Sequence, residues 1–401
     1  MNDSVLIVGG GQAGAQAALS LRQGGFAGAL TILGDEPYVP YERPPLSKSF
    51  LAGDVTEERM FMRPEAFYAE KTITLRRGRA VSIARGQHRL HLENGEHLAY
   101  GTLILATGGR VRHLNCPGAD LAGVHYLRTI DDVLGFKNRL QAGARVVIVG
   151  GGYIGLETAA VAVKRGCKVI VLEMQPRVLA RVVAPEMSAF YTRVHREAGV
   201  DVRIGAVVTG FGGTGKVEHV ICGDEIIPAD VVIVGIGIVP NAELADDAGL
   251  DVDDGIVVDE NARTSDRDIF AAGDCTRQFN TIAGESIRLE SVPNALAQGK
   301  AAALTILGKP VPPVEVPWFW SDQYDLKLQM AGLAKPGDAV VIRGDEATRR
   351  FSACYLRDGV FVACHAVNMA KDFLQSKKLI ADRARPDLAR LGDPALALKD
   401  L

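Results

Sequence analysis

The sequence predicts an α/β fold in which two parallel sheets, each covered by helices, are followed by a smaller α+β domain. The first observation behind this prediction is a repeated pattern at residues 5–14 and 146–155, in which an apolar strand runs into G-x-G-x-x-G and an alanine-rich helix. The second is the alternation of other short apolar runs with helical segments, which is typical of parallel sheets. The repeat indicates an internal duplication of a whole domain.

Further elements follow from the same reasoning. Strands are expected at 30–33, 103–106, 169–172 and 231–234. A third part of the chain begins after the proline-rich stretch 310–313, a plausible linker. There we expect a small antiparallel sheet and a closing helix, with strands at 339–342, 351–356 and 360–363 and a helix over 369–380. We therefore predict a discontinuous first domain (1–110 and 240–313), a second domain (111–239) and a C-terminal domain (314–401).

Each glycine of the repeated turn has its own physical purpose. One makes the tight turn, one lets the backbone approach a pyrophosphate, and one lets helix and strand pack closely, while the helix N-terminus attracts the phosphate charge. The residues expected to bind in this way are Gly9, Gly11, Gln12, Ala13 and Gly14 in the first turn and Gly150, Gly152, Tyr153, Ile154 and Gly155 in the second. Two such turns predict two dinucleotides and electron transfer between them.

An acidic residue about 20 residues past each turn would hold the adenosine ribose hydroxyls. In the second motif this residue is Glu173, and a carboxylate there repels a ribose phosphate, which favours NADH over NADPH. In the first motif the fit is looser: Asp35 or Glu36 could serve, and Asp35 is our prediction. Two other strand ends point to a flavin in the first domain, one running into Ala106, Thr107 and Gly108 and one ending in Gly273 and Asp274.

The composition excludes several classes of function. Net charge is −3 and the pI is about 6.3, which gives no general attraction to nucleic acid. No apolar run approaches the roughly 20 residues that a membrane-spanning helix needs, and no signal peptide is expected. The six cysteines form no C-x-x-C pair and match no zinc site, so we expect a reduced cytoplasmic protein without a metal ion.

Several longer stretches then identify a family resemblance. They are 40–48 (P-Y-E-R-P-P-L-S-K), 150–157 (G-G-G-Y-I-G-L-E), 234–237, 272–274 and 317–323 (P-W-F-W-S-D-Q). With the two turns they resemble the flavoproteins that include glutathione reductase, and within them the NADH-dependent ferredoxin reductases of bacterial oxygenase systems. The resemblance implies a glutathione-reductase-like fold, non-covalent FAD, NADH, and a [2Fe-2S] ferredoxin that supplies a haem-thiolate monooxygenase or a Rieske dioxygenase. It also implies a monomer or weak homodimer that binds neither nucleic acid nor membrane.

The resemblance also assigns residues. Lys48 would lie near the reactive side of the flavin and Glu157 near the nicotinamide, where the two could pair, while the Tyr153 ring could cover the flavin face. Trp320 would lie on the electron route to ferredoxin. The remaining flavin residues would be Arg43, Val81, Arg128, Val292 and Trp318, and the remaining NADH residues Gly235, Ile236 and Gly237. Val292 stands where several dioxygenase reductases carry an aromatic residue.

Two alternatives share this architecture. An NADH oxidase or disulfide reductase would pass electrons to a thiol near the flavin, but the sequence has no cysteine before Cys116. A redox-sensing interaction protein resembling apoptosis-inducing factor would be expected to have a basic nucleic-acid surface, a targeting peptide or long inserts. Ferredoxin reduction is therefore our prediction, with these two as alternatives.

Overall fold

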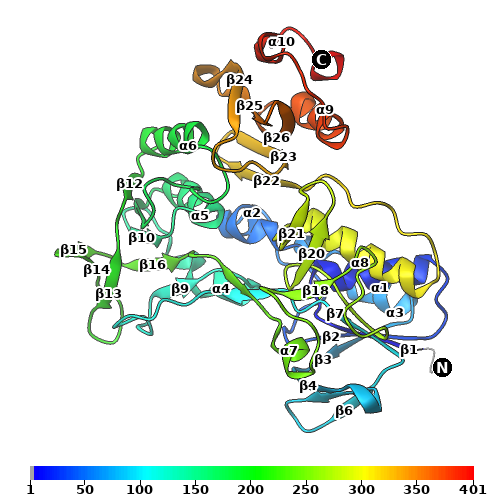
Figure 1. Cartoon of the computed structure of the whole chain (residues 1–401). Helices are drawn as coiled ribbons and strands as arrows, with labels where there is room; N and C mark the ends of the chain where they lie inside the picture. The colour runs from blue at the N-terminus through cyan, green and yellow to red at the C-terminus, as the bar shows by residue number, and fades with distance from the viewer. Residues whose placement is uncertain (1–3) are drawn as a thin grey trace. The chain divides into compact units, whose positions relative to one another are not determined.

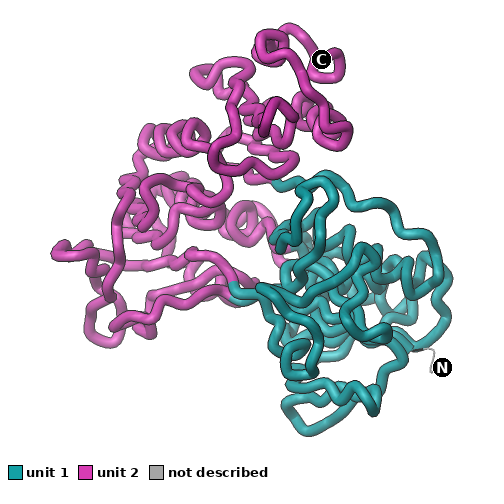
Figure 2. Tube along the Cα trace, in the orientation of Figure 1, with its two compact units in different colours: residues 1–42, 58–110, 239–319 teal, residues 43–57, 111–238, 320–401 magenta. Residues whose placement is uncertain are grey.

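The computed structural model describes residues 4–401 and divides the chain into two compact units. The first unit comprises residues 1–42, 58–110 and 239–319, of which 1–3 are not described, and the second comprises 43–57, 111–238 and 320–401 (Figure 2). Two short strands, β8 (Gly109–Val111) and β17 (Ile238–Pro240), lie where the chain passes from one unit to the other. Within residues 4–401, no helix is long and apolar enough to span a membrane.

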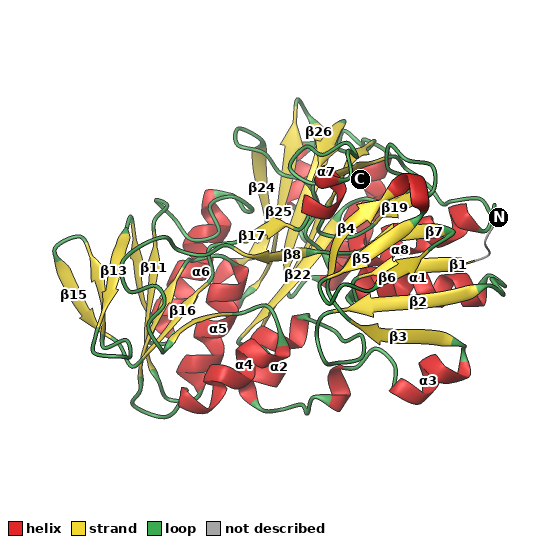
Figure 3. Cartoon of the chain, turned by 90° about the horizontal axis from the view of Figure 1, so that it is seen from below, coloured by secondary structure: helices red, strands yellow, loops and turns green. Residues whose placement is uncertain are grey.

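The first unit is built on a parallel sheet whose described strands have the order β19-β7-β1-β2-β3 (Figure 1). These strands are β1 (Ser4–Val8), β2 (Ala29–Gly34), β3 (Ile73–Arg77), β7 (Thr102–Leu105) and β19 (Ile269–Ala271). Helices α1 (Gln12–Gln23) and α8 (Val292–Ile306) bury alanine-rich faces against one side of it (Figure 3). The small side chains let the two helices pack closely to each other and to the sheet.

The other face of this sheet is covered by a second hydrophobic cluster. The antiparallel strands β4 (Ala80–Ala84), β5 (Arg89–Leu92) and β6 (His97–Ala99) pack there, with helix α7 (Glu243–Asp247). The unit also contains α3 (Glu65–Glu70), the 3₁₀ turn Glu58–Met60, and a small sheet of β18 (Ile256–Val258), β20 (Thr276–Asn280) and β21 (Glu285–Ile287).

The second unit repeats the parallel design with the strand order β12-β11-β10-β16-β9 among the described residues. These strands are β9 (Val124–Tyr126), β10 (Arg145–Val149), β11 (Lys168–Glu173), β12 (Asp201–Ile204) and β16 (Val231–Val234). The helices around them are α2 (Ser49–Ala52), α4 (Ile130–Phe136), α5 (Tyr153–Lys164) and α6 (Pro185–Glu197). Strands β13 (Val208–Gly212), β14 (His219–Cys222) and β15 (Glu225–Pro228) form a separate antiparallel sheet.

The C-terminal part of this unit is an antiparallel sheet, as expected from the sequence, and its strands have the order β22-β23-β26-β25-β24 among the described residues. Its strands are β22 (Trp318–Gln323), β23 (Leu326–Gly332), β24 (Ala339–Asp345), β25 (Arg350–Arg357) and β26 (Val360–Val367), and helix α9 (Ala370–Ala381) packs on it. Helix α10 (Leu388–Gly392) follows. The tail is fastened by the buried Arg343, which pairs with Asp372 at 3.2 Å and donates to carbonyl oxygens of Leu391, Asp393 and Leu396.

The sequence-based strands at 30–33, 103–106, 169–172 and 231–234 are confirmed within a residue or two as β2, β7, β11 and β16. The C-terminal strands and helix are confirmed as well, although β24 and β26 are longer than expected. Strands β22 and β23 were not predicted. The division into domains 1–110 with 240–313, 111–239 and 314–401 remains a proposal.

Candidate functional site: two glycine turns and a buried carboxylate

The first glycine turn joins β1 to α1 and has no space for side chains at its two ends. Gly9 has φ 118°, and a Cβ there would lie 2.1 Å from the carbonyl oxygen of Ala106, at the end of β7. A Cβ on Gly14 would lie 2.1 Å from the Gly9 carbonyl oxygen. Around Gly11, in contrast, no described atom lies within 4 Å of an added Cβ. The backbone is therefore closely packed at Gly9 and Gly14. It is open at Gly11, where a pyrophosphate would approach.

The second turn, between β10 and α5, has the same construction. Gly150 has φ 111°, and its added Cβ would lie 2.3 Å from the carbonyl oxygen of Gly235, at the end of β16. A Cβ on Gly155 would lie 2.1 Å from the Gly150 carbonyl oxygen, and Gly152 again faces open space among the described atoms. The predicted set Gly150, Gly155, Gly235 and Ile236 is thus brought together, because Ile236 also contacts the position of the added Cβ on Gly150.

Both turns fit a dinucleotide pyrophosphate. Helices α1 and α5 begin after Gly11 and Gly152, and in the described structure no side chain caps either helix. Neither first turn carries an acidic residue that would repel an anion. The backbone N–H groups and the positive dipole end of each helix are therefore available to a phosphate group.

The acidic residue differs between the two turns. Glu173, the last residue of β11, accepts hydrogen bonds from the Gly151 N–H at 2.6 Å and the Gln175 N–H at 2.7 Å, which fixes its carboxylate beside the turn. In the first unit Leu33 pairs with Val8 as Leu172 pairs with Val149, so Gly34 occupies the position of Glu173. The predicted Asp35 follows one residue later.

The neighbouring Glu36 accepts a hydrogen bond from the Tyr41 hydroxyl at 2.5 Å. This register explains why the acidic residue expected for the first turn lies farther along the sequence than Glu173 does from the second turn. The assignment of Asp35 stays a prediction. The other predicted strand ends do meet the first turn. Ala106 touches Gly9, and the Cβ of Ala13 would lie 3.1 Å from a Cβ on Gly273, whose N–H donates to Gln298. Thr107 donates its hydroxyl to the Asn241 carbonyl at 2.6 Å, and Gly108 follows with φ 62°.

A buried carboxylate is a further candidate feature of the second unit. Glu157 on α5 is 2% exposed and accepts three hydrogen bonds: from Lys48 Nζ at 2.6 Å, from Ser47 Oγ at 2.5 Å and from Ser321 Oγ at 2.6 Å. The expected ion pair of Lys48 and Glu157 is present. The sequence analysis missed Ser47 and Ser321. Ser47 directly precedes Lys48 in the motif by which Lys48 was identified.

The remaining predicted residues lie as follows. Tyr153 begins α5 and donates its hydroxyl to Met330 Sδ at 3.0 Å, and Arg43 donates to the Arg128 carbonyl at 2.6 Å, so both pairs meet within the second unit. Ile154 is exposed and Gly237 has φ 99°. Val81 is exposed on β4, in a different sheet from the first turn, and Val292 begins α8 after its Ser291 cap. Trp318 and Trp320 are half-buried on β22.

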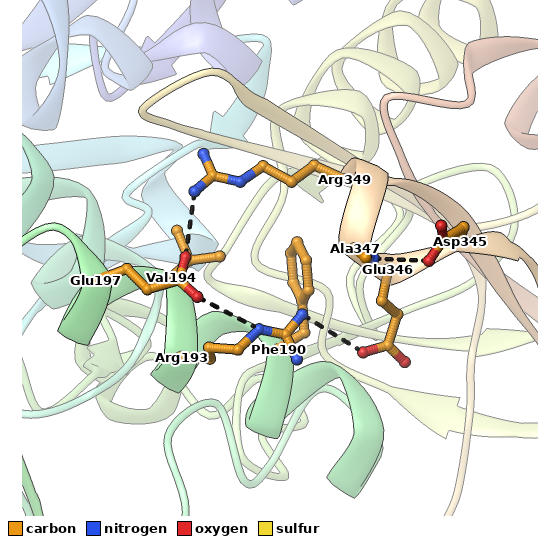
Figure 4. Close-up of a pocket in the computed structure, with 8 residues that line it drawn as sticks. All are labelled: Phe190, Arg193, Val194, Glu197, Asp345, Glu346, Ala347 and Arg349. Carbon is orange, nitrogen blue, oxygen red and sulfur yellow. Dashed lines mark hydrogen bonds and ion pairs between the residues drawn. The ribbon is translucent and has the colours of Figure 1, made fainter.

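One hollow of about 480 Å³ lies between α6 and the β24–β25 connection, away from both turns in sequence (Figure 4). Its arginines are neutralised by neighbouring carboxylates: Arg193 lies 3.7 Å from Glu197 and 3.7 Å from Glu346, and Arg349 lies 3.3 Å from Glu197. With Asp345 it contains more acids than bases. It therefore does not suit a phosphate-bearing ligand.

Comparison with known proteins agrees with this geometry. The family model described as pyridine nucleotide-disulphide oxidoreductase matches residues 3–299, and the reductase C-terminal model matches residues 318–401. Putidaredoxin reductase of Pseudomonas putida is 44% identical over 100% of this chain and 97% of its own. The ferredoxin–NAD(+) reductase component of the anthranilate 1,2-dioxygenase system of Burkholderia cepacia is 42% identical over 99% of this chain and 98% of its own.

A solved structure of the covalent putidaredoxin reductase–putidaredoxin complex matches with a TM-score of 0.97 and 43% identity, covering 100% of this chain and 98% of that chain. Proteins of this kind use FAD and NAD(H), for which the two uncapped helix N-termini provide suitable sites. The chain belongs to the pyridine nucleotide-disulphide oxidoreductase family, with a glutathione-reductase-like fold and the reductase C-terminal domain.

Proposed function

We propose that this chain is an NADH-dependent ferredoxin reductase that supplies electrons to a [2Fe-2S] ferredoxin of an oxygenase system and works in the cytoplasm. The observation that carries the proposal is the pair of turns with similar backbone geometry, the second of which holds the Glu173 carboxylate fixed beside it. FAD, when bound, can accept a hydride from NADH and release electrons one at a time, as a ferredoxin requires.

The first turn would hold the FAD pyrophosphate, with the remaining predicted flavin residues around it. The second would bind NADH, with Glu173 accepting hydrogen bonds from the ribose hydroxyls. Arg177 supports this choice, because its guanidinium donates to the Val183 and Ala180 carbonyls and to Ser188 Oγ rather than being directed at a ribose phosphate. These bonds leave NADH favoured over NADPH.

Lys48 would supply positive charge near the reduced flavin, and Glu157 would hold that ammonium group in place. A preorganised charge in a site protected from water stabilises charge that develops during the reaction. Tyr153 would shield the site before NADH binds, and Trp320 would lie on the electron route to the ferredoxin.

The cysteines argue against a disulfide reductase. Cys354 and Cys364 face each other across β25 and β26, but both are fully buried. A hydrogen bond that the Cys354 thiol donates to Cys364, together with desolvation, raises the pKa of the Cys354 thiol well above its usual value. A protonated, inaccessible thiol is a poor nucleophile, so this pair does not suit thiol–disulfide exchange.

The test is NADH oxidation by the FAD-loaded protein with and without a [2Fe-2S] ferredoxin. We expect ferredoxin to be reduced at tens per second or faster, on the order of common enzyme turnover, and air to oxidise the protein much more slowly. Rapid oxidation by air with no stimulation by ferredoxin would contradict the proposal and favour an oxidase. Absence of turnover with either acceptor would favour a redox-sensing protein.

Trp320→Ala tests the electron route separately. We expect it to slow ferredoxin reduction more than flavin reduction by NADH, because only the former would pass this residue. Equal slowing of both steps would assign Trp320 to packing instead.

A further inference from the structure

A line of hydrogen bonds links the buried Glu157 to the protein surface within the second unit. Ser321 Oγ lies 2.6 Å from Glu157 Oε1, and Gln323 Nε2 lies 3.1 Å from Ser321 Oγ. Gln323 Oε1 then lies 2.8 Å from His195 Nε2, and His195 Nδ1 lies 2.9 Å from the Tyr324 hydroxyl. The four links join α5, β22, α6 and the turn that follows β22.

The direction of every bond follows from the carboxylate. A carboxylate only accepts, so Ser321 must donate its proton to Glu157 and its oxygen is left to accept from the Gln323 amide. The Gln323 carbonyl oxygen then accepts from His195 Nε2–H. A neutral imidazole with its proton on Nε2 has an acceptor at Nδ1, so the Tyr324 hydroxyl donates there. All four donors point towards Glu157.

Burial strengthens the hydrogen bonds along this line. Ser321, Gln323 and His195 are each at most 1% exposed, whereas Tyr324 at the outer end is 38% exposed. Hydrogen bonds in such a low-dielectric interior polarise one another along a chain. Burial also lowers the pKa of His195 to about 4, against the opposing effect of its hydrogen bond with Gln323, so the ring is neutral near pH 7.

The local backbone suits the same purpose. Ser321 and Gln323 are alternate residues of β22 and therefore share one face of the strand. Tyr324 has φ 56°, a left-handed conformation that is unfavourable for a residue other than glycine. That conformation occurs at the residue whose hydroxyl reaches His195.

We propose that Tyr324, His195, Gln323 and Ser321 are positioning residues that orient Glu157 and polarise the hydrogen bonds to it, so that Glu157 holds Lys48 in place for the reaction with NADH. The line transmits polarisation rather than protons, since the amide of Gln323 in its middle does not ordinarily give up a proton and take another. Only the effect on the reaction rests on the proposed function; the orientation of the hydrogen bonds does not.

The first experiment is nitrogen-15 NMR of labelled histidines near pH 7, with the His195 signals assigned from their loss in His195→Gln. We expect the neutral Nε2–H form, and we expect Tyr324→Phe to shift the Nδ1 signal because its donor is gone. A His195 with its proton on Nδ1, or one unaffected by Tyr324→Phe, would overturn the proposal. This readout needs neither ferredoxin nor turnover, so it stands even if the proposed function fails.

The second experiment is single-turnover reduction of the bound flavin by NADH, measured over a range of NADH concentrations. His195→Leu should slow reduction at saturating NADH by about tenfold, the size expected from weakening a buried hydrogen-bonded group, with little change in the half-saturating concentration. His195→Gln keeps an N–H donor near the position of Nε2 and should recover most of the rate. A purely structural role of His195 would not explain a reduction rate that is kept in His195→Gln and lost in His195→Leu.

Tyr191→Phe is the matched control. Tyr191 lies one helical turn before His195 on α6 and is fully buried, and its hydroxyl has no hydrogen-bond partner among the described residues. Its removal should leave the rate and the His195 signals unchanged. If His195→Leu does not fold, Tyr324→Phe at the exposed end should still slow reduction by about twofold to threefold, a smaller loss because this link is solvated. A wild-type rate in Tyr324→Phe, or equal slowing in Tyr191→Phe, would contradict the proposal.

Discussion

The two glycine turns have nearly the same backbone and very different surroundings. Gly9 and Gly150 differ by only a few degrees in φ, and each lies against a carbonyl oxygen from a neighbouring strand. The helices that follow differ in charge at their fifth residue, which is the half-buried Gln16 in α1 and the buried Glu157 in α5. Gln16 makes only a local bond to Ser20, at 2.9 Å, among the contacts described, whereas Glu157 gathers Ser47, Lys48 and Ser321.

This difference suggests that the backbone of the turns and the side chains around them have different roles. The shared backbone provides what any dinucleotide pyrophosphate needs, whereas we propose that the side chains around the second turn supply charge and nucleotide selectivity. We propose accordingly that the first turn holds FAD throughout the reaction cycle and that the second receives NADH only transiently.

The largest effect is expected from alanine at the first glycine of either turn. Gly9→Ala and Gly150→Ala each place a Cβ within 2.3 Å of a carbonyl oxygen, and the backbone strain alone costs about 1–3 kcal/mol. We expect Gly9→Ala to be purified without its yellow flavin, and Gly150→Ala to keep the flavin but lose reduction by NADH. The absorbance spectrum and an NADH titration measure both.

Gly10→Ala is the control for this pair, because an added Cβ there meets no described atom within 4 Å. It should keep its flavin. A Gly9→Ala protein with full flavin content would break the assignment of the first turn.

The next largest effect concerns the fifth residue of each helix. Glu157→Ala should lower the free energy of unfolding by about 3–5 kcal/mol, since it leaves Lys48 and two buried hydroxyls without their acceptor. Gln16→Ala should cost less than about 1 kcal/mol, because it removes one local bond. Denaturant unfolding of both variants provides the measurement, and equal losses would contradict the asymmetry of the two helices.

The two units should also differ in how much stability they lose as the pH falls. Burial lowers the pKa of His195 to about 4 and of His365 to about 3, both in the second unit. Between pH 6.5 and 4 the unfolded chain binds a proton at His195 that the folded chain does not, so stability falls as the pH falls, by about 3 kcal/mol from His195 alone. Unfolding midpoints of wild type and His195→Gln across this range test it. An equally steep loss in the variant would be inconsistent with this origin.

The smallest effect is expected in nucleotide selectivity. Glu173→Ala should raise the use of NADPH relative to NADH by about tenfold, the effect of losing one charge-assisted bond and one repulsion. Adding an arginine nearby should increase the change. Asp35→Ala in the first turn should leave the ratio unaltered, and the ratio of kcat/KM values for the two nucleotides decides between these outcomes.

The parts of the fold that were predictable are those set by local constraints. A glycine at φ above 100° beside a carbonyl oxygen leaves a signature in a short stretch of sequence, so both turns and their strands were found. Strand β22 was missed because Ser321 and Gln323 lie on its buried face and interrupt the apolar alternation that marks a strand. The acidic residue of the first glycine turn was hard to place because Gly34 occupies the register position that Glu173 has in the second unit.

The buried network around Glu157 could not be found from sequence. Ser321 lies 164 residues from Glu157 along the chain, and His195 lies 128 residues from Gln323. No local pattern marks a serine or histidine that meets its partner only after folding. Lys48 and Glu157 were predicted because a family resemblance named them, and Ser47, Ser321, Gln323 and His195 had no such guide.

The most direct test of the account mixes the FAD-loaded protein first with NADH in the absence of oxygen and then with a [2Fe-2S] ferredoxin, following the flavin and iron–sulfur absorbance separately. We expect one fast two-electron bleaching of a flavin that stays bound, followed by reduction of two ferredoxins for each NADH oxidised. Flavin that leaves the protein during the cycle, or a reduced flavin that passes no electrons to ferredoxin, would contradict it.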